Sequence, residues 1–317
     1  MNFNDKLRES AKSTGSIVCM GLDPVLEAIP NAVIKNRSLR FSIPLFLEEI
    51  FIEMKKQKVL PGAFKPNAGF YLKHDKPLEI TLSENDRFAG SLALASVIYE
   101  AKQIFPDIPL ILDYKRGDIA TSSKNYAVEG FDCWGADAVT VAPYMGTDSV
   151  SPFAEYSKQG KGVYVLNRTS NKGAEDLQDL KVTSGHFSLV PLYEIVAHKI
   201  VDWAKASPGV GAVVGATAPR ELSDIAALYV KSGVEVPLLI PGVGKQGGSA
   251  QEVTARLREA GYPLELARIN SSSGITHPWE KNKDLAKKLE NKSMQDYAKA
   301  CVEQLAKLNE EIGYKPA

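Results

Sequence analysis

The sequence lacks the features that mark disulfide-rich, secreted and membrane-spanning proteins. Its 317 residues include three cysteines, Cys19, Cys133 and Cys301. They are too few and too scattered for a disulfide framework or a zinc site, and we expect reduced, buried packing residues. No run of eighteen apolar residues occurs, so no membrane span is expected. The first ten residues mix charges and lack the apolar core of a signal peptide. We therefore expect a cytoplasmic protein.

The sequence also lacks net charge and a histidine cluster. Lys plus Arg and Asp plus Glu both number 38, which gives a formal net charge of zero. Nucleic acids and anionic membranes favour a basic surface, so neither is an expected partner. An anionic small molecule would have to be held by a local pocket. The four histidines, His74, His186, His198 and His277, are not spaced as metal ligands, so we interpret them as surface or packing residues.

Eight apolar segments bounded by turn residues predict buried strands. They alternate with helix-like stretches, which calls for a parallel sheet with helical crossovers. Eight such units favour an α/β fold of the (β/α)8 TIM-barrel class, formed by a single domain over residues 1–317 with extra terminal helices. A doubly wound open sheet is the alternative. The strands are expected at 16–23, 60–67, 108–115, 138–144, 161–170, 211–217, 236–244 and 267–273, and the helices include 46–56, 91–104, 192–206, 219–231, 250–260 and an amphipathic tail at 284–312.

Polar residues collect where these apolar segments end. Asp23 ends the first segment, Lys65 lies near the end of the second, and Ser170 ends the fifth. In α/β barrels the carboxyl ends of the strands form the active site. We expect these side chains to surround one pocket.

The third segment ends in the most informative pattern, an Asp-x-Lys-x-x-Asp formed by Asp113, Lys115 and Asp118. Strand residues two apart share a face, so Asp113 and Lys115 should project together. Lys65 on the neighbouring strand completes an alternating Lys-Asp-Lys-Asp array. Each charge then has a neighbour of opposite sign, which keeps all four groups ionised. A lysine held in this way is a well-placed proton donor.

Six motifs follow one another along the chain. They are GLDP at 21–24, FKPNAGFY at 64–71, LDYKRGDIATSSKNYA at 112–127, VAPYMG at 141–146, NRTSN at 167–171 and PGVGKQGG at 241–248. Together and in this order they resemble the orotidine 5'-monophosphate (OMP) decarboxylase family, and its longer bacterial branch in particular. This resemblance implies a TIM barrel that converts OMP to uridine 5'-monophosphate (UMP) in de novo pyrimidine biosynthesis, with neither metal nor cofactor.

The resemblance also implies roles for individual residues. Lys115 would be the general acid that protonates the ring carbon as CO2 leaves, and Asp113 would lie beside the substrate carboxylate. Lys65 and Asp23 would bind the ribose hydroxyls. Ser170 would contact the pyrimidine edge.

A homodimer is part of the same expectation. The resemblance implies that Asp118 joins the charged array of the partner subunit's site. Ser122, at a position where the family usually has threonine, would contact the ribose across the interface.

The phosphate of the nucleotide is expected near the seventh and eighth segments, as in other barrels. Pro241 and Gly242 begin a glycine-rich turn whose backbone can approach an anion, and Gln246 would supply a side-chain amide.

One position departs from the family pattern. The eighth segment reads INSSSGI, with Ser273 where the resemblance leads us to expect a phosphate-binding arginine. Arg268 and Lys245 are candidates for the missing charge, although the odd spacing of Arg268 points it to the other face of its strand. Ser272, Ser273 and the amide of Gly274 are the uncharged candidates.

Two other functions stay open. The first is a Mg2+-dependent sugar-phosphate decarboxylase or synthase of the same superfamily, which shares the Asp-x-Lys-x-x-Asp pattern. The second is a barrel that binds nucleotides without catalysis, for which Ser273 is the only support. Turnover of OMP with and without a chelator separates the three.

Overall fold

The computed structural model describes residues 1–30, 38–185, 187–244 and 247–316, so the predictions for His186, Lys245 and Gln246 lie outside the described residues. Eight parallel strands form one sheet in the order β2-β1-β10-β9-β8-β5-β4-β3. Single bridges from Phe64 to Leu110 and from Asn67 to Asp113 join β2 to β3 and close the sheet. The strands are β1 (Val18–Gly21), β2 (Ala63–Lys65), β3 (Ile111–Arg116), β4 (Ala138–Val141), β5 (Gly162–Arg168), β8 (Val210–Val214), β9 (Leu238–Ile240) and β10 (Ala267–Ser271).

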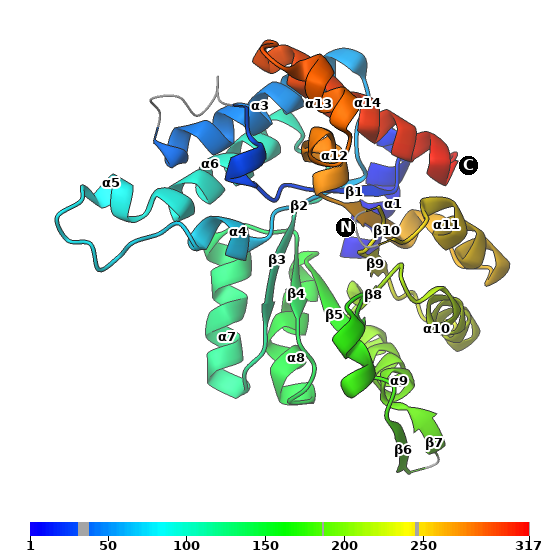
Figure 1. The fold of residues 1–317 in the computed structure, drawn as a ribbon. Helices are drawn as coiled ribbons and strands as arrows, with labels where there is room; N and C mark the ends of the chain where they lie inside the picture. Colours follow the sequence, from blue (N-terminus) through cyan, green and yellow to red (C-terminus); the bar gives the residue numbers. More distant parts are fainter. Residues whose placement is uncertain (31–37, 186, 245–246, 317) are drawn as a thin grey trace.

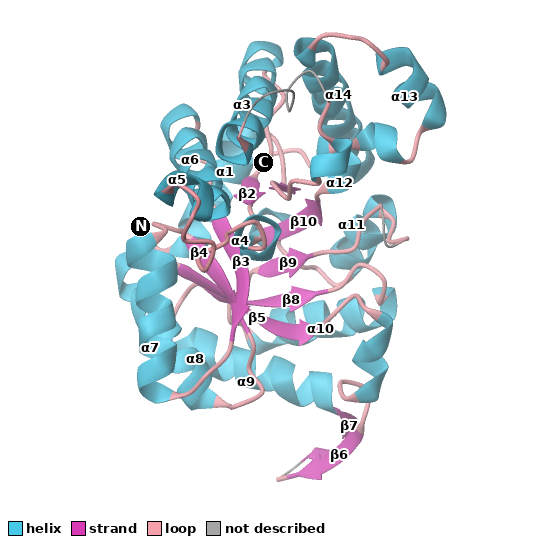
Figure 2. Cartoon of the chain, turned by 60° about the vertical axis from the view of Figure 1, so that its left-hand side comes forward, coloured by secondary structure: helices cyan, strands magenta, loops and turns pink. Residues whose placement is uncertain are grey.

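The predicted barrel is therefore confirmed, and the open-sheet alternative is wrong. Each of the eight predicted segments overlaps one observed strand. Strands β1, β4, β8 and β10 are buried at every position, because one face lines the barrel interior and the other packs under helices. Figures 1 and 2 show the helices arranged around the outside of these strands.

The helices follow the predicted alternation with some differences in their bounds. Helix α3 begins at Leu39 rather than at residue 46 and carries Pro44 within its early turns. The tail predicted as one stretch is two helices, because a turn precedes Ser293, whose side chain and that of Asp296 form a capping box at the start of the last helix. The helices are α1 (Phe3–Thr14), α3 (Leu39–Gln57), α4 (Ala68–Leu72), α5 (Glu84–Arg87), α6 (Ala89–Ile104), α7 (Ala120–Val128), α8 (Thr147–Ala154), α9 (Leu192–Ala206), α10 (Pro219–Ser232), α11 (Ala250–Glu259), α12 (Ser273–Thr276), α13 (Lys283–Leu289) and α14 (Met294–Ile312).

A β-hairpin between β5 and α9 was not expected from the sequence. Strands β6 (Lys181–Ser184) and β7 (Phe187–Pro191) pair antiparallel in a sheet of their own. The hairpin extends away from the barrel in both views (Figures 1 and 2). The β7 strand is exposed or half-buried along its length, unlike the buried strands of the barrel, so it does not fit the pattern of a buried apolar segment.

The structure tests two expectations, that the three cysteines are buried and that no helix spans a membrane. Cys19 and Cys301 are buried free thiols, but Cys133 is exposed, so the expectation that all three fill the core is wrong for Cys133. Within the described part of the chain, no helix combines the length and apolarity that crossing a membrane requires.

Candidate active site

A cavity of about 510 Å³ opens at the carboxyl ends of the barrel strands. It brings together most of the residues selected from the sequence, although they come from strands far apart in the chain. The predicted residues that line it are Asp23, Lys65, Asp113, Lys115, Ser170, Pro241, Gly242, Ser272 and Ser273.

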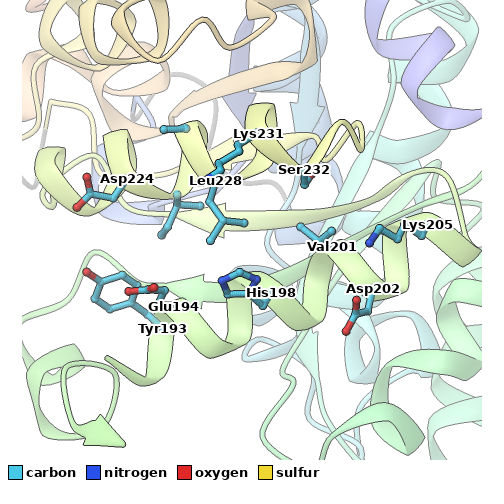
Figure 3. Close-up of a pocket in the computed structure, with 12 residues that line it drawn as sticks. Tyr193, Glu194, His198, Val201, Asp202, Lys205, Asp224, Leu228, Lys231 and Ser232 are labelled. Carbon is cyan, nitrogen blue, oxygen red and sulfur yellow. The ribbon is translucent and has the colours of Figure 1, made fainter. Parts of the chain in front are cut away.

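A larger hollow of about 660 Å³ lies elsewhere, between helices α9 and α10 on the outside of the barrel. Figure 3 shows Tyr193, Glu194 and His198 of one helix facing Asp224 and Leu228 of the other. None of the residues predicted from the motifs lines this hollow. The candidate site is therefore the smaller cavity at the mouth of the barrel.

The centre of this site is the carboxylate of Asp113, which accepts four hydrogen bonds. Its Oδ2 lies 2.9 Å from Nζ of Lys65 and 3.4 Å from Nδ2 of Asn67. Its Oδ1 lies 2.6 Å from Nζ of Lys115 and 2.9 Å from Oγ1 of Thr140. Asp113 and Lys65 are buried, whereas the Lys115 side chain is about half exposed. Asp113 therefore bridges a buried ammonium to one that faces the cavity.

The environment keeps Asp113 and Lys65 ionised. Burial alone would raise the pKa of Asp113, but the ammonium groups of Lys65 and Lys115 bring it well below its ordinary value. Burial alone would lower the pKa of Lys65, yet the negative charges of Asp113 and Asp23 raise it above its ordinary value. Near neutral pH, Asp113 is a carboxylate and Lys65 an ammonium.

The backbone at Lys115 is not an ordinary strand. Pairing between β3 and β4 shifts register between Leu112 and Arg116, and Lys115 has a φ of 44°. Few residues other than glycine adopt this left-handed conformation. Asp113 and Lys115 were expected to project together from a regular strand. The pairing exists, but a bulge produces it.

Asp23 and Asn67 connect the loops beside the cluster. Asp23 Oδ1 accepts a hydrogen bond of 2.9 Å from the backbone N–H of Asn67. The Asn67 side chain caps helix α4 through the N–H of Gly69 and also donates to Asp113. Asn67 is thus a site residue that was not among those predicted from the sequence. Its position two residues after Lys65 was a signal that could have identified it.

The opposite end of the cavity is formed by glycines and hydroxyls after β9 and β10. Gly242 has a φ of 103°, a conformation that glycine adopts without strain. Gly21 allows another close approach, because a Cβ built there would lie 1.9 Å from Oγ of Ser272. Among the described residues lining the cavity, the cations are Lys65 and Lys115, and both bind Asp113.

Arg268 does not belong to this site, so its prediction as a phosphate ligand is wrong. Its side chain is fully buried. Nε lies 3.0 Å from the carbonyl oxygen of Gly62, and Nη2 lies 2.6 Å from that of Leu7. Nη1 binds the carbonyl oxygens of Glu265 and Ala267 at 3.0 and 2.8 Å. The guanidinium joins α1 to β10 and to the segment before β2.

Replacing Arg268 with methionine should lower stability and spare the site. The Arg268→Met variant removes the guanidinium donor from four carbonyl groups, of which that of Gly62 still accepts from Ser10 Oγ, so we expect unfolding to be easier by about 3 kcal/mol. Urea denaturation measures this loss. Activity per folded molecule should stay unchanged. A large loss of nucleotide affinity in folded protein would show instead that Arg268 binds the phosphate.

Asp118 and Ser122 lie beside the cavity mouth without lining it in their own chain. Asp118 follows β3, and its Oδ1 accepts a hydrogen bond from the N–H of Ile119. Ser122 is exposed on α7. The apolar side chains of Ile119 and Tyr144 nearby are 53% and 86% exposed. The predicted partner subunit remains a prediction.

The fold and the cavity together define a (β/α)8 barrel with an ionised lysine and aspartate cluster at the carboxyl ends of its strands. The model of the orotidine 5'-phosphate decarboxylase / HUMPS family matches residues 63–276. An orotidine 5'-phosphate decarboxylase of Thermomicrobium roseum is 38% identical over 265 residues, covering 83% of this chain and 84% of the relative. One of Cupriavidus metallidurans is 36% identical over 295 residues, covering 93% and 96%.

A solved structure gives the same result. The OMP decarboxylase of Leishmania donovani superposes with a TM-score of 0.64 at 28% identity, covering 98% of this chain and 99% of that one. The chain belongs to the orotidine 5'-phosphate decarboxylase / HUMPS family. The resemblance inferred from the six motifs is confirmed.

Proposed function

We propose that this chain is a carboxy-lyase that converts OMP to UMP and CO2 in pyrimidine biosynthesis. Family membership supports the reaction, because the relatives named above are orotidine 5'-phosphate decarboxylases. The observation that carries the proposal for this chain is the carboxylate of Asp113 held between Lys65 and Lys115 at the cavity. In this cluster a fixed negative charge, the Asp113 carboxylate, is hydrogen-bonded directly to a proton donor, the Lys115 ammonium.

The substrate is proposed to lie across the cavity. Its carboxylate and ring carbon face Asp113 and Lys115, and its ribose hydroxyls approach Asp23 and Lys65. The pyrimidine edge meets Ser170 after β5. The phosphate then reaches the glycines and hydroxyls that follow β9 and β10, at Gly242 and Ser272.

In the chemical step, the bond between the ring carbon and the carboxylate carbon breaks and CO2 leaves. The bonding electron pair stays on the ring carbon, and the Lys115 ammonium supplies the proton that forms the new C–H bond. Lys115 becomes a neutral amine and regains its proton from water. Its charge stabilises the negative charge that develops on the ring carbon, where a preorganised cation is most effective. Asp113, ionised beside the substrate carboxylate, disfavours the bound ground state.

The proposed active unit is a homodimer. Asp118 would extend the array as the partner's second carboxylate, and Ser122 would reach the partner's ribose. The exposed apolar side chains of Ile119, which follows Asp118 in the chain, and of Tyr144, in the loop after the neighbouring strand β4, support an interface here.

The test is turnover of OMP followed by ultraviolet absorbance, with and without EDTA. The proposal expects full activity in both samples, because the proposed chemistry uses no metal or cofactor. Loss of activity with EDTA, restored by Mg2+, would favour a metal-dependent member of the superfamily. Binding of UMP without any turnover would favour a barrel that has lost catalysis.

The phosphate end offers a separate prediction. Replacing Ser273 with arginine places a charged, forked donor at the end of β10, where it can bind two phosphate oxygens. We expect the Ser273→Arg variant to lower the KM for OMP by about 10-fold or more, with little change in kcat. Steady-state kinetics measures both constants. An unchanged KM would mean that another group already neutralises the phosphate.

A further inference from the structure

Thr140 on β4 contacts both functional parts of β3. Its side chain is buried, and it lies opposite the bulge that contains Asp113 and Lys115. Oγ1 lies 2.9 Å from Oδ1 of Asp113. The same oxygen lies 3.0 Å from the backbone nitrogen of Lys115 and 3.2 Å from that of Tyr114.

These contacts fix the direction of the hydroxyl proton. A backbone N–H can only donate, so Thr140 Oγ1 accepts from both Tyr114 and Lys115. A hydroxyl has two lone pairs and one proton, and both lone pairs are then in use. The proton must point at Asp113, whose carboxylate accepts it.

The bulge explains why a side chain makes these bonds. Leu112 pairs with Val139, and the next paired residues are Arg116 and Val141. Three residues of β3 therefore stand opposite Thr140 alone. The backbone N–H groups of Tyr114 and Lys115 donate to the Thr140 hydroxyl instead of to a carbonyl group of β4. Lys115 keeps its strained φ of 44° while its N–H is held by this bond.

We infer that Thr140 is a positioning residue for the decarboxylation, acting through Lys115 and Asp113. This inference rests on the proposed function. The hydroxyl holds the backbone turn that brings the Lys115 ammonium back to Asp113, and it orients the carboxylate. When Lys115 has given its proton away, Thr140 still donates to Asp113 and keeps that side chain in place for the next turnover.

The test compares valine and serine at this position. Thr140→Val keeps the shape and removes the hydroxyl, whereas Thr140→Ser keeps the hydroxyl. We expect the valine variant to lose about 100-fold in kcat, because a small displacement of the proton donor is costly. Its affinity for UMP, measured by calorimetry, should stay within about threefold, because Thr140 bears on the proton donor and not on the phosphate end. The Thr140→Ser variant should keep most of the wild-type kcat.

Thr254 on α11 provides a matched control. It is equally buried and donates to the carbonyl of Ala250 at 2.8 Å, far along the chain from the cluster. Thr254→Val should cost stability without lowering kcat. If Thr140→Val does not fold, Thr140→Ala compared with Thr140→Ser makes the same test, because these two variants differ only in the hydroxyl.

The outcomes separate the two proposals. Wild-type protein that binds UMP but does not turn over OMP overturns the proposed function and this inference with it. Active wild type with a valine or alanine variant as fast as the serine variant overturns the role of Thr140 and leaves the proposed function standing. Equal losses of kcat and UMP affinity in the valine variant would also reject the positioning role, because they indicate general damage to the cavity.

Discussion

The Lys115→Ala variant should lose OMP turnover by at least about 1,000-fold, as expected when the proton donor of the chemical step is removed. UMP should still bind, because the glycine and hydroxyl end of the cavity is unchanged. Steady-state and single-turnover kinetics measure the loss, and calorimetry measures UMP binding. Turnover near the wild-type rate would show that another group protonates the ring carbon.

The fold should tolerate this change. The Lys115 side chain is 48% exposed, and Asp113 keeps its bonds from Lys65, Thr140 and Asn67. Alanine at the left-handed backbone position bears the same strain that lysine already bears. Lys199→Ala is a suitable control, since Lys199 lies on the outer helix α9 with its side chain 61% exposed and should be silent.

Mixing two inactive variants should restore activity if the site is shared between subunits. Lys115→Ala and Asp118→Asn each remove one member of every array, so each homodimer should be inactive. In a heterodimer, one site lacks both residues and the other has both. Random pairing then makes about a quarter of all sites complete, and about a quarter of the wild-type activity should return after co-expression.

The control for this experiment pairs Lys115→Ala with Asp113→Asn. Both residues belong to the same chain's cavity, so neither site of that heterodimer is complete and no activity should return. Restoration in the control, or none in the first mixture, would contradict the exchange of Asp118 between subunits. An active Asp118→Asn homodimer would remove Asp118 from the mechanism.

The barrel could be predicted because its strands are buried on both faces. Strand β8, for example, is buried at every position, and polar residues that end other predicted segments, such as Asp23 and Ser170, reach the cavity. The hairpin of β6 and β7 could not be predicted in this way, since β7 is exposed or half-buried at each position.

The bulge at Lys115 could not be predicted from the sequence for another reason. A regular strand and a bulged strand both place Asp113 beside Lys115, so the charge pattern does not distinguish them. The signal for Thr140 was present, because it is the one polar residue of β4. Its function depends on a register shift that no local pattern encodes.

Arg268 shows the limit of reasoning from proximity to a motif. Arg268 shares a face of β10 with Asn270, which lines the cavity, but its side chain binds the carbonyl groups of Gly62 before β2 and of Leu7 on α1, away from the carboxyl ends of the strands. The partner carbonyl of Leu7 is 261 residues away in the chain, and such long-range contacts are not visible in one sequence.

Release of 13CO2 from OMP labelled in its carboxylate is the most direct measurement of the proposed chemistry. Purified wild-type protein, treated with EDTA, should release one labelled CO2 for each UMP formed, and the Lys115→Ala variant should release almost none over the same time. Labelled CO2 released equally by both proteins, or by neither, would contradict the assignment of this cluster as the decarboxylation site.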